Sequence, residues 1–271
     1  MILNDRLCGL FVLLLAGGVL TASGVRWATN GPTRYARVEA DGGSVLLGQN
    51  LMNMVYWALQ PVADLCISLG ITANAITGGS LVLGACSGVA MYCGAFGLGA
   101  VFVMLSSVGD ALDGLVARKT GLASDAGEVF DAAVDRYVEF FFIGGILLHY
   151  TQQPWVQALA LASLAGSFMI SYSSAKAEAL RVAAPRGSMR RAERAVYLTM
   201  AAALTPLVGA IRGVTPLMLA LALVALVANA SAIGRLRSIA RSRKNARGDQ
   251  KENGVEKGVA SRALPLREGR P

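Results

Sequence analysis

The sequence of 271 residues contains few charged side chains, one histidine, four cysteines and few aromatic residues. Charged residues make up 15% of the chain, whereas soluble globular domains carry roughly 25%. This scarcity excludes an ordinary soluble domain. The single histidine, His149, excludes a metal site built from several histidines. The cysteines form no C-x2-C pair and lie in or near apolar runs, so we interpret them as small buried side chains.

Apolar residues are correspondingly abundant, at 54% of the chain with a mean hydropathy of +0.52. Stretches of about 20 apolar residues are long enough to cross a bilayer as helices. The sequence therefore predicts an all-α, polytopic membrane protein with a six-helix transmembrane core and one extra N-terminal hydrophobic segment. The expected spans are about residues 7–25, 74–95, 97–117, 129–149, 155–175, 195–211 and 214–234.

The segments between these runs alternate between basic and uncharged. Arg118 and Lys119 follow one run and several arginines lie within 181–194, whereas 95–97 and 149–154 contain no Lys or Arg. Basic loops face the cytoplasm. We therefore expect an integral protein of the cell inner or plasma membrane, with both ends of the six-helix core on the cytoplasmic side.

Most of the net charge of +8 lies at the C-terminus, where residues 235–271 hold eleven Lys and Arg against four acidic residues. This composition predicts a disordered cytosolic tail near anionic membrane lipids, with no nucleic-acid partner. We divide the chain into an N-terminal anchor with a basic loop (1–44), a membrane domain (45–237) and the basic tail (238–271).

Two N-terminal segments each allow two interpretations. Arg6, the apolar run after it and the small residues near 22–24 also suit a cleavable signal peptide, but the basic loop that follows favours a retained anchor. Residues 45–70 carry Pro61 and Asp64 among apolar and aromatic positions. They predict a helix in the membrane interface rather than an eighth, broken span.

Carboxylates are concentrated in one short stretch. Of the 13 acidic residues before the tail, seven lie between Asp110 and Glu139. Asp110 and Asp113 share one helix face, and Asp131 and Asp135 share a face of the next helix. A short turn between the helices brings these four aspartates together just inside the membrane.

Four carboxylates beside a membrane are costly and repel one another, so a cation must lie between them. Oxygen ligands of this kind select Mg²⁺ or Mn²⁺ rather than zinc. Two such ions would clamp the attacking and leaving oxygens of a phosphoryl displacement. The pattern therefore predicts a metal centre, with a two-metal site as our hypothesis.

Small residues accompany the aspartates. Gly114 and Ala117 lie one turn apart on the first helix, and Gly127 starts the second. They leave room for a flat group near the backbone, although small residues more often serve helix packing. Arg118 ends the first helix and is placed to grip a diphosphate, or else simply extends its charged end to the membrane surface.

Together these residues form the pattern D-x2-D-G-x2-A-R-x8-G-x3-D-x3-D. This pattern resembles the signature of the CDP-alcohol phosphotransferase family (class I CDP-alcohol phosphatidyltransferases). Within the family, the chain is most similar to members like phosphatidylinositol-phosphate synthase. The resemblance covers about residues 45–237. It implies a homodimeric membrane enzyme of phospholipid synthesis with an interfacial N-terminal helix. The segment from Ile71 to Thr77 is similar to the family's P-N-x-x-T, with Ala73 in place of the proline.

The resemblance also implies roles for individual residues. Asp110, Asp113, Asp131 and Asp135 would hold the metal ions, and Asp135 would also act as the base. The cytidine diphosphate of a donor such as CDP-diacylglycerol would be received by Gly114, Ala117, Arg118 and Gly127. The hydroxyl of a small polar alcohol would attack the β-phosphorus, and CMP would leave.

The acceptor alcohol is less well defined. The resemblance to phosphatidylinositol-phosphate synthases implies a basic pocket for a phosphorylated acceptor, but Ser174 stands where those enzymes place a lysine. An inositol-type acceptor is therefore only favoured over glycerol 3-phosphate, and serine stays open. The basic residues are alternatively topology markers or headgroup contacts. The candidate acceptor residues are Lys176, Arg191, Arg194 and Arg235.

Two other functions compete with this interpretation. A membrane prenyltransferase would need widely separated Asp motifs, whereas both pairs here lie within 26 residues. An ion transporter would place its carboxylates near the middle of the membrane, in broken helices. Metal-dependent release of CMP would distinguish the family's reaction from both.

Overall fold

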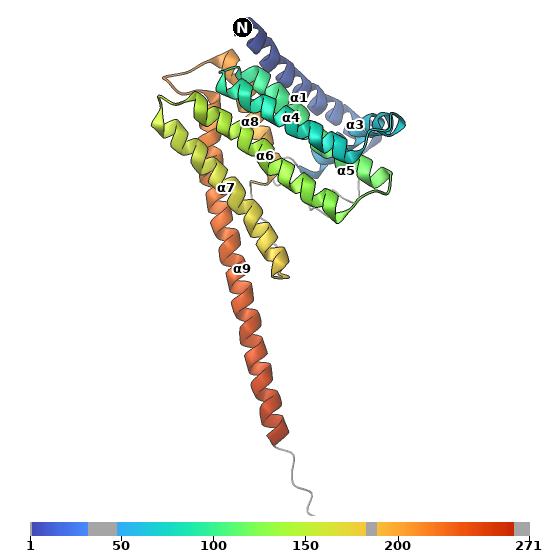
Figure 1. Ribbon diagram of the computed structural model, residues 1–271, viewed down its shortest axis with the longest axis vertical. Coiled ribbons are helices and arrows are strands. Elements are labelled where there is room, and N and C mark those ends of the chain that lie inside the picture. The colour runs from blue at the N-terminus through green and yellow to red at the C-terminus, as the bar shows by residue number, and fades with distance from the viewer. Residues whose placement is uncertain (1, 32–47, 183–188, 263–271) are drawn as a thin grey trace, which may run out of the picture.

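The computed structural model describes residues 2–31, 48–182 and 189–262 (Figure 1). Its described residues form eight helices and no strand, so the prediction of an all-α membrane fold is confirmed. The helices are α1 (Ile2–Asn30), α3 (Gly48–Ser68), α4 (Ala73–Tyr92), α5 (Phe96–Lys119), α6 (Asp125–His149), α7 (Pro154–Ala179), α8 (Arg191–Val208) and α9 (Pro216–Arg262).

Five of these helices, α1, α4, α5, α7 and α9, are long and apolar enough to cross a membrane. The other two expected spans, α6 and α8, form helices but are more polar. α6 carries Asp135, Arg136 and Glu139 well inside its length, and α8 has only 18 residues and begins with charged ones. The six-helix count therefore stays a prediction.

Local sequence explains how the hairpin of α5 and α6 forms. α5 ends at Lys119, and Gly121 follows in the left-handed region with φ of 68°. Glycine adopts this conformation without steric cost and closes the helix end. Ser124 then caps α6, because its hydroxyl accepts a hydrogen bond from the backbone N–H of Gly127 at 3.2 Å. These two signals bring the aspartates of both helices to the same end.

Glycines allow α4 and α6 to pack closely. A side chain on Gly88 of α4 would collide with the backbone of Phe141, and one on Gly145 of α6 would collide with the backbone of Gly88. Small residues at such spacing are the usual means by which membrane helices approach each other. These close glycine contacts fix the position of α6 relative to α4.

Polar side chains join α7 to α9. Ser163 donates a hydrogen bond to the carbonyl oxygen of Leu221 at 2.9 Å, and the Asn229 amide donates to that of Ala162 at 2.8 Å. α9 lies beside α7 and then extends far beyond the other helices (Figure 1). It continues to Arg262, across the boundary at residue 237 where the sequence predicts a disordered tail. Ala, Arg, Lys and Glu are strong helix formers, which accounts for the continuation.

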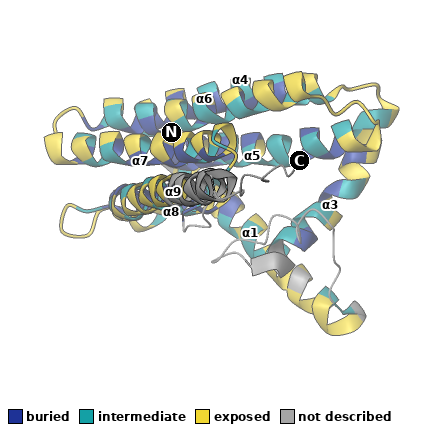
Figure 2. Cartoon of the chain, turned by 90° about the horizontal axis from the view of Figure 1, so that it is seen from below, coloured by how far each residue is buried: buried dark blue, intermediate teal, exposed yellow. Residues whose placement is uncertain are grey.

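The N-terminal helix α1 packs on both α5 and α8. Asp5 accepts a hydrogen bond from the backbone N–H of Leu98 at 2.9 Å, near the start of α5. Gly9 lies so close to Ala203 of α8 that any side chain there would collide with it. Towards its other end, the Arg26 guanidinium lies 4.0 Å from the centre of the Trp57 ring of α3. The remaining faces of α1 are largely exposed (Figure 2).

The helix α3 coincides with the segment expected in the membrane interface and continues through Pro61. Its Leu59 and Ala63 pack against Leu112 and Val116 near the end of α5. α3 therefore covers the end of the helix that carries Asp110 and Asp113.

Candidate active site

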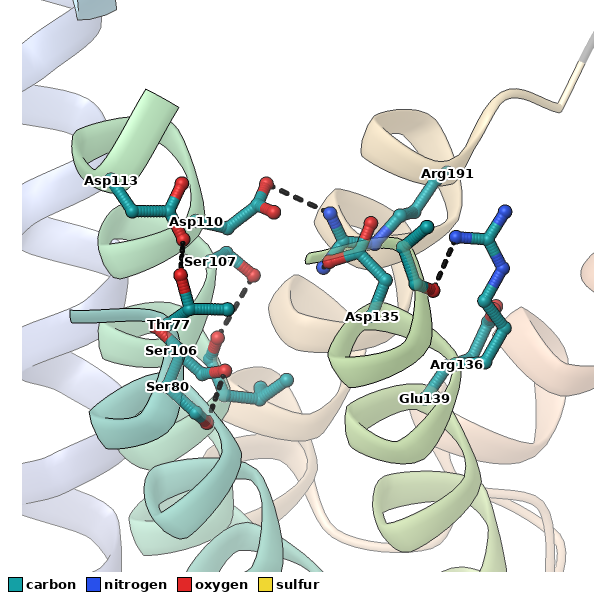
Figure 3. A network of polar contacts seen from close by, with 12 residues as sticks. Thr77, Ser80, Ser106, Ser107, Asp110, Asp113, Asp135, Arg136, Glu139 and Arg191 are labelled. Carbon is teal, nitrogen blue, oxygen red and sulfur yellow. Dashed lines mark hydrogen bonds and ion pairs between the residues drawn. The ribbon is translucent and has the colours of Figure 1, made fainter. Parts of the chain in front are cut away.

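The four predicted aspartates lie on the facing helices α5 and α6. Figure 3 shows three of them, Asp110, Asp113 and Asp135. Carboxylate oxygens of Asp110, Asp131 and Asp135 lie within 4.8 Å of one another, and all three residues are partly buried. They line a narrow cavity together with Thr77 and Ser80 of α4 and Arg191 of α8. Three oxygen donors that converge from two helices fit a hard divalent ion such as Mg²⁺ or Mn²⁺.

Asp113 lines the same cavity but is held differently from the other three aspartates. It is buried, and one carboxylate oxygen accepts a hydrogen bond of 2.6 Å from the hydroxyl of Thr77 on α4 (Figure 3). A hydroxyl bonded to one oxygen fixes the carboxylate and leaves its other oxygen available. Thr77 is thus a site residue to which the sequence assigned no role, although it lies in the segment compared with P-N-x-x-T.

Arg191, the first residue of α8, lies between the two acidic helices. Its guanidinium is 2.8 Å from a carboxylate oxygen of Asp110 and 2.5 Å from one of Asp135 (Figure 3). It therefore supplies positive charge to the carboxylate cluster. The sequence placed Arg191 among candidate acceptor residues but did not predict these ion pairs.

A second, small cavity adjoins the carboxylates. Asp135 and Arg191 line both cavities, and the second extends among apolar side chains of α5, α6 and α8 that include Val103, Phe142 and Leu198. Charged and apolar side chains therefore lie next to each other at this site.

The residues predicted to receive the cytidine diphosphate lie at the outer end of the hairpin. Arg118 is exposed, and its guanidinium lies 3.5 Å from the hydroxyl of Tyr56 on α3. A side chain on Gly114 would lie 3.0 Å from the same guanidinium. Gly127 lies at the capped start of α6, and Ala117 is half-buried. Tyr56 is a further neighbour that the sequence analysis did not single out.

The four candidate acceptor residues have different surroundings. Arg194 is 1% exposed, and its guanidinium donates to both carboxylate oxygens of Glu139 on α6 at 2.8 and 3.0 Å, and to the carbonyl oxygen of Met189. Arg235 is buried and lies 3.5 Å from the hydroxyl of Ser174. Lys176 is exposed on α7. Only Arg191 contacts the aspartates among the described contacts of these four.

Parts of the sequence are similar to proteins of known name. A bifunctional IPC transferase and DIPP synthase of Aquifex aeolicus is 35% identical over 107 residues, which are 38% of this chain and 24% of that protein. The chain thus spans about a quarter of the length of that relative. The phosphatidylinositol phosphate synthase of Cutibacterium acnes is 30% identical over 162 residues, which are 56% of this chain and 76% of that protein.

Solved structures share the fold. The phosphatidylinositol phosphate synthase of Mycobacterium tuberculosis, crystallised with manganese and citrate, has a TM-score of 0.61 and 24% identity over 67% of this chain and 88% of its own. The same protein with CDP-DAG bound also has a TM-score of 0.61, over 67% and 92% of the two chains.

The sequence pattern of the family described as CDP-alcohol phosphatidyltransferase matches residues 70–235, which are more than half of the chain. This match begins just before α4 and ends near the point where α9 leaves the bundle, so it includes both acidic helices. The chain belongs to the CDP-alcohol phosphatidyltransferase family of membrane transferases.

Proposed function

We propose that this protein transfers a phosphatidyl group from CDP-diacylglycerol to a small polar alcohol in a metal-dependent reaction that releases CMP. The observation that carries the proposal is the convergence of Asp110, Asp131 and Asp135 beside an apolar cavity. The carboxylates suit a divalent metal, which would attract the diphosphate, and the adjacent apolar side chains suit contact with the lipid part of the donor.

In this proposal Asp110, Asp113, Asp131 and Asp135 hold Mg²⁺ or Mn²⁺, in a site for two ions. The bound metal supplies positive charge that stabilises the phosphate oxygens as their charge grows. Arg118 binds the diphosphate, and Gly114, Ala117 and Gly127 leave space for the cytidine side of the donor. The exposure of Arg118 and its contact with Tyr56 support a binding surface between α3 and α5.

The chemical step is a displacement at the β-phosphorus of the donor. The oxygen of the acceptor hydroxyl bonds to this phosphorus while the bond from phosphorus to the bridging oxygen of CMP breaks. The hydroxyl proton passes to a carboxylate oxygen of Asp135, acting as general base, and CMP leaves with the electron pair. Asp135 lines both cavities, which supports a position between donor and acceptor.

The favoured acceptor is an inositol phosphate. Several relatives are named for phosphatidylinositol phosphate or archaetidylinositol phosphate synthesis. Arginine binds phosphate through two parallel hydrogen bonds. Arg191 and Arg235 supply such groups, and Lys176 on α7 is a further candidate. Arg194 is already engaged by Glu139, so we assign it to holding α8 on α6. Glycerol 3-phosphate, with the same phosphate group, is the alternative acceptor.

We further propose that the active-site end of the bundle faces the cytoplasm and that the protein forms a homodimer. The basic residues at the end of α5 and just before α8 support this orientation under the positive-inside rule. We propose that α1 is retained as an anchor, a role supported by its contacts through Asp5 and Gly9. The basic extension of α9 would then lie near anionic lipids.

Purified protein supplied with CDP-diacylglycerol, Mn²⁺ and one acceptor at a time tests this function. The panel is inositol 1-phosphate, inositol, glycerol 3-phosphate and serine, and mass spectrometry identifies the lipid product. We expect a phosphatidylinositol phosphate product whose formation Asp135→Asn strongly slows. A phosphatidylglycerophosphate product would keep the chemistry and overturn the inositol assignment, whereas no product with any acceptor would overturn the proposed function.

A further inference from the structure

Arg191 occupies an unusual position for a residue that is to bind an acceptor. Its guanidinium bridges Asp110 of α5 and Asp135 of α6, at 2.8 and 2.5 Å. Both aspartates belong to the set of three whose oxygens converge. Arginine and a divalent cation would therefore be drawn to the same two carboxylates.

The helix that carries Arg191 is firmly held. Glu193 accepts hydrogen bonds from the backbone N–H groups of Met189 and Arg190 at 2.7 and 3.1 Å, which caps the start of α8. Arg194, one turn further along, is bound to Glu139 of α6. The backbone at Arg191 is thus fixed next to the cluster, while its own side chain is 33% exposed.

The long side chain of Arg191 borders two cavities. It lines the cavity of the four aspartates and the adjoining cavity with Val103, Phe142 and Leu198. Because the side chain lines both cavities, the displacement that we infer below is a rotation of the side chain alone, with α8 kept in place.

Resting on the proposed function, we infer that Arg191 is an exchangeable counter-charge, which neutralises Asp110 and Asp135 until a divalent cation takes its place. A bound cation repels the adjacent guanidinium and compensates the same carboxylates. The displaced guanidinium is then free to bind the phosphate of the acceptor. Metal binding and phosphate binding therefore favour each other, and by linkage the effect is reciprocal.

A titration with Mn²⁺, followed by electron paramagnetic resonance of the free ion, tests this without turnover. The full-length protein is titrated in detergent with no CDP-lipid, with and without inorganic phosphate, and a protein-free titration corrects for Mn²⁺–phosphate complexes. In the wild type we expect phosphate to tighten Mn²⁺ binding by a factor in the range of about 5–150, typical of coupled sites.

The decisive variant is Arg191→Gln, which removes the competing charge. We expect it to bind Mn²⁺ more tightly than the wild type when phosphate is absent, and to lose the effect of phosphate. Arg237→Gln is the matched control, because it removes the same charge from an exposed position on α9. It should behave as the wild type.

Thermal unfolding gives a second readout that does not depend on phosphate. Without metal, Arg191→Gln leaves the carboxylates to repel one another, so Mn²⁺ should raise its melting temperature more than that of the wild type. Equal or weaker Mn²⁺ binding by Arg191→Gln, together with an equal or smaller rise in melting temperature, would overturn the inference and leave the proposed function intact. Absence of Mn²⁺ binding in the wild type would instead overturn the metal centre itself.

Discussion

The acidic and the basic sides of the site are built in different ways. Asp110, Asp113, Asp131 and Asp135 come from one helical hairpin, and glycine contacts with α4 fix the depth of its second helix. The candidate basic residues come from three helices, α7, α8 and α9, and among their described contacts only those of Arg191 reach the aspartates. Local sequence can therefore specify the carboxylates, whereas the basic side depends on how distant helices pack.

The largest effect on activity should come from replacing a carboxylate on the acidic side of the site. We expect Asp135→Asn to lower the rate of phosphatidyl transfer by about 10²–10⁴-fold, the usual contribution of a general base. The rate is measured as lipid product formed with saturating donor and acceptor. Asp125→Asn, on the exposed first residue of the same helix, is the control and should keep the wild-type rate. Equal losses in both variants would contradict a specific role for Asp135.

On the basic side, Arg194 should matter for stability. Arg194→Met leaves Glu139 buried without its partner, which costs about 3–5 kcal/mol in comparable buried pairs. The free energy of unfolding in detergent measures this loss. Replacing both residues, as Arg194→Met with Glu139→Leu, should cost less than Arg194→Met alone. A double variant as unstable as the sum of the two single variants would show that the pair acts only through packing.

Thr77 offers a smaller and more selective change on the acidic side. Thr77→Val removes the hydroxyl that donates to Asp113 but keeps the shape of the side chain. We expect metal affinity or activity to fall by about 10–100-fold, as for other residues that orient a metal ligand. Thr77→Ser, which restores the hydroxyl, should recover most of it. If serine and valine behaved alike in Mn²⁺ titrations, the hydrogen bond would have no such role.

The smallest effect should come from the contact between α3 and α5. Lys119 and Asp64 form an ion pair of 2.5 Å, but Asp64 is 64% exposed. Exposed pairs contribute about 0.2–1 kcal/mol and are screened by salt. Asp64→Asn should therefore lower the melting temperature slightly at low salt and not at high salt. A large loss at both would mean that the ion pair, rather than the apolar contact of Leu59 and Ala63, holds α3.

The hairpin could be predicted because its signals are local. Apolar length, the turn after Lys119 and the spacing of the aspartates all lie within one short stretch of sequence. Even there, spacing alone did not predict that Asp110 and Asp113 have different partners. The difference arises because Asp113 faces Thr77 on α4, a residue 36 positions away.

Arg191 and Arg194 show the same limit more clearly. They are three residues apart at the start of α8, and sequence analysis gave them the same candidate role. One contacts the aspartates and the other is buried against Glu139, 55 positions away. Helical spacing predicts that two residues share a face, but the packing of α8 against α6 determines which one is buried.

The central claim is that the aspartates of α5 and α6 form a metal centre for phosphatidyl transfer. Its most direct test uses EDTA-treated protein with CDP-diacylglycerol and inositol 1-phosphate, and measures CMP and lipid product together as Mn²⁺ or Mg²⁺ is added. We predict that both products are absent without the divalent ion and then appear in equal amounts. Continued transfer in EDTA, or CMP released without the lipid product, would contradict the account.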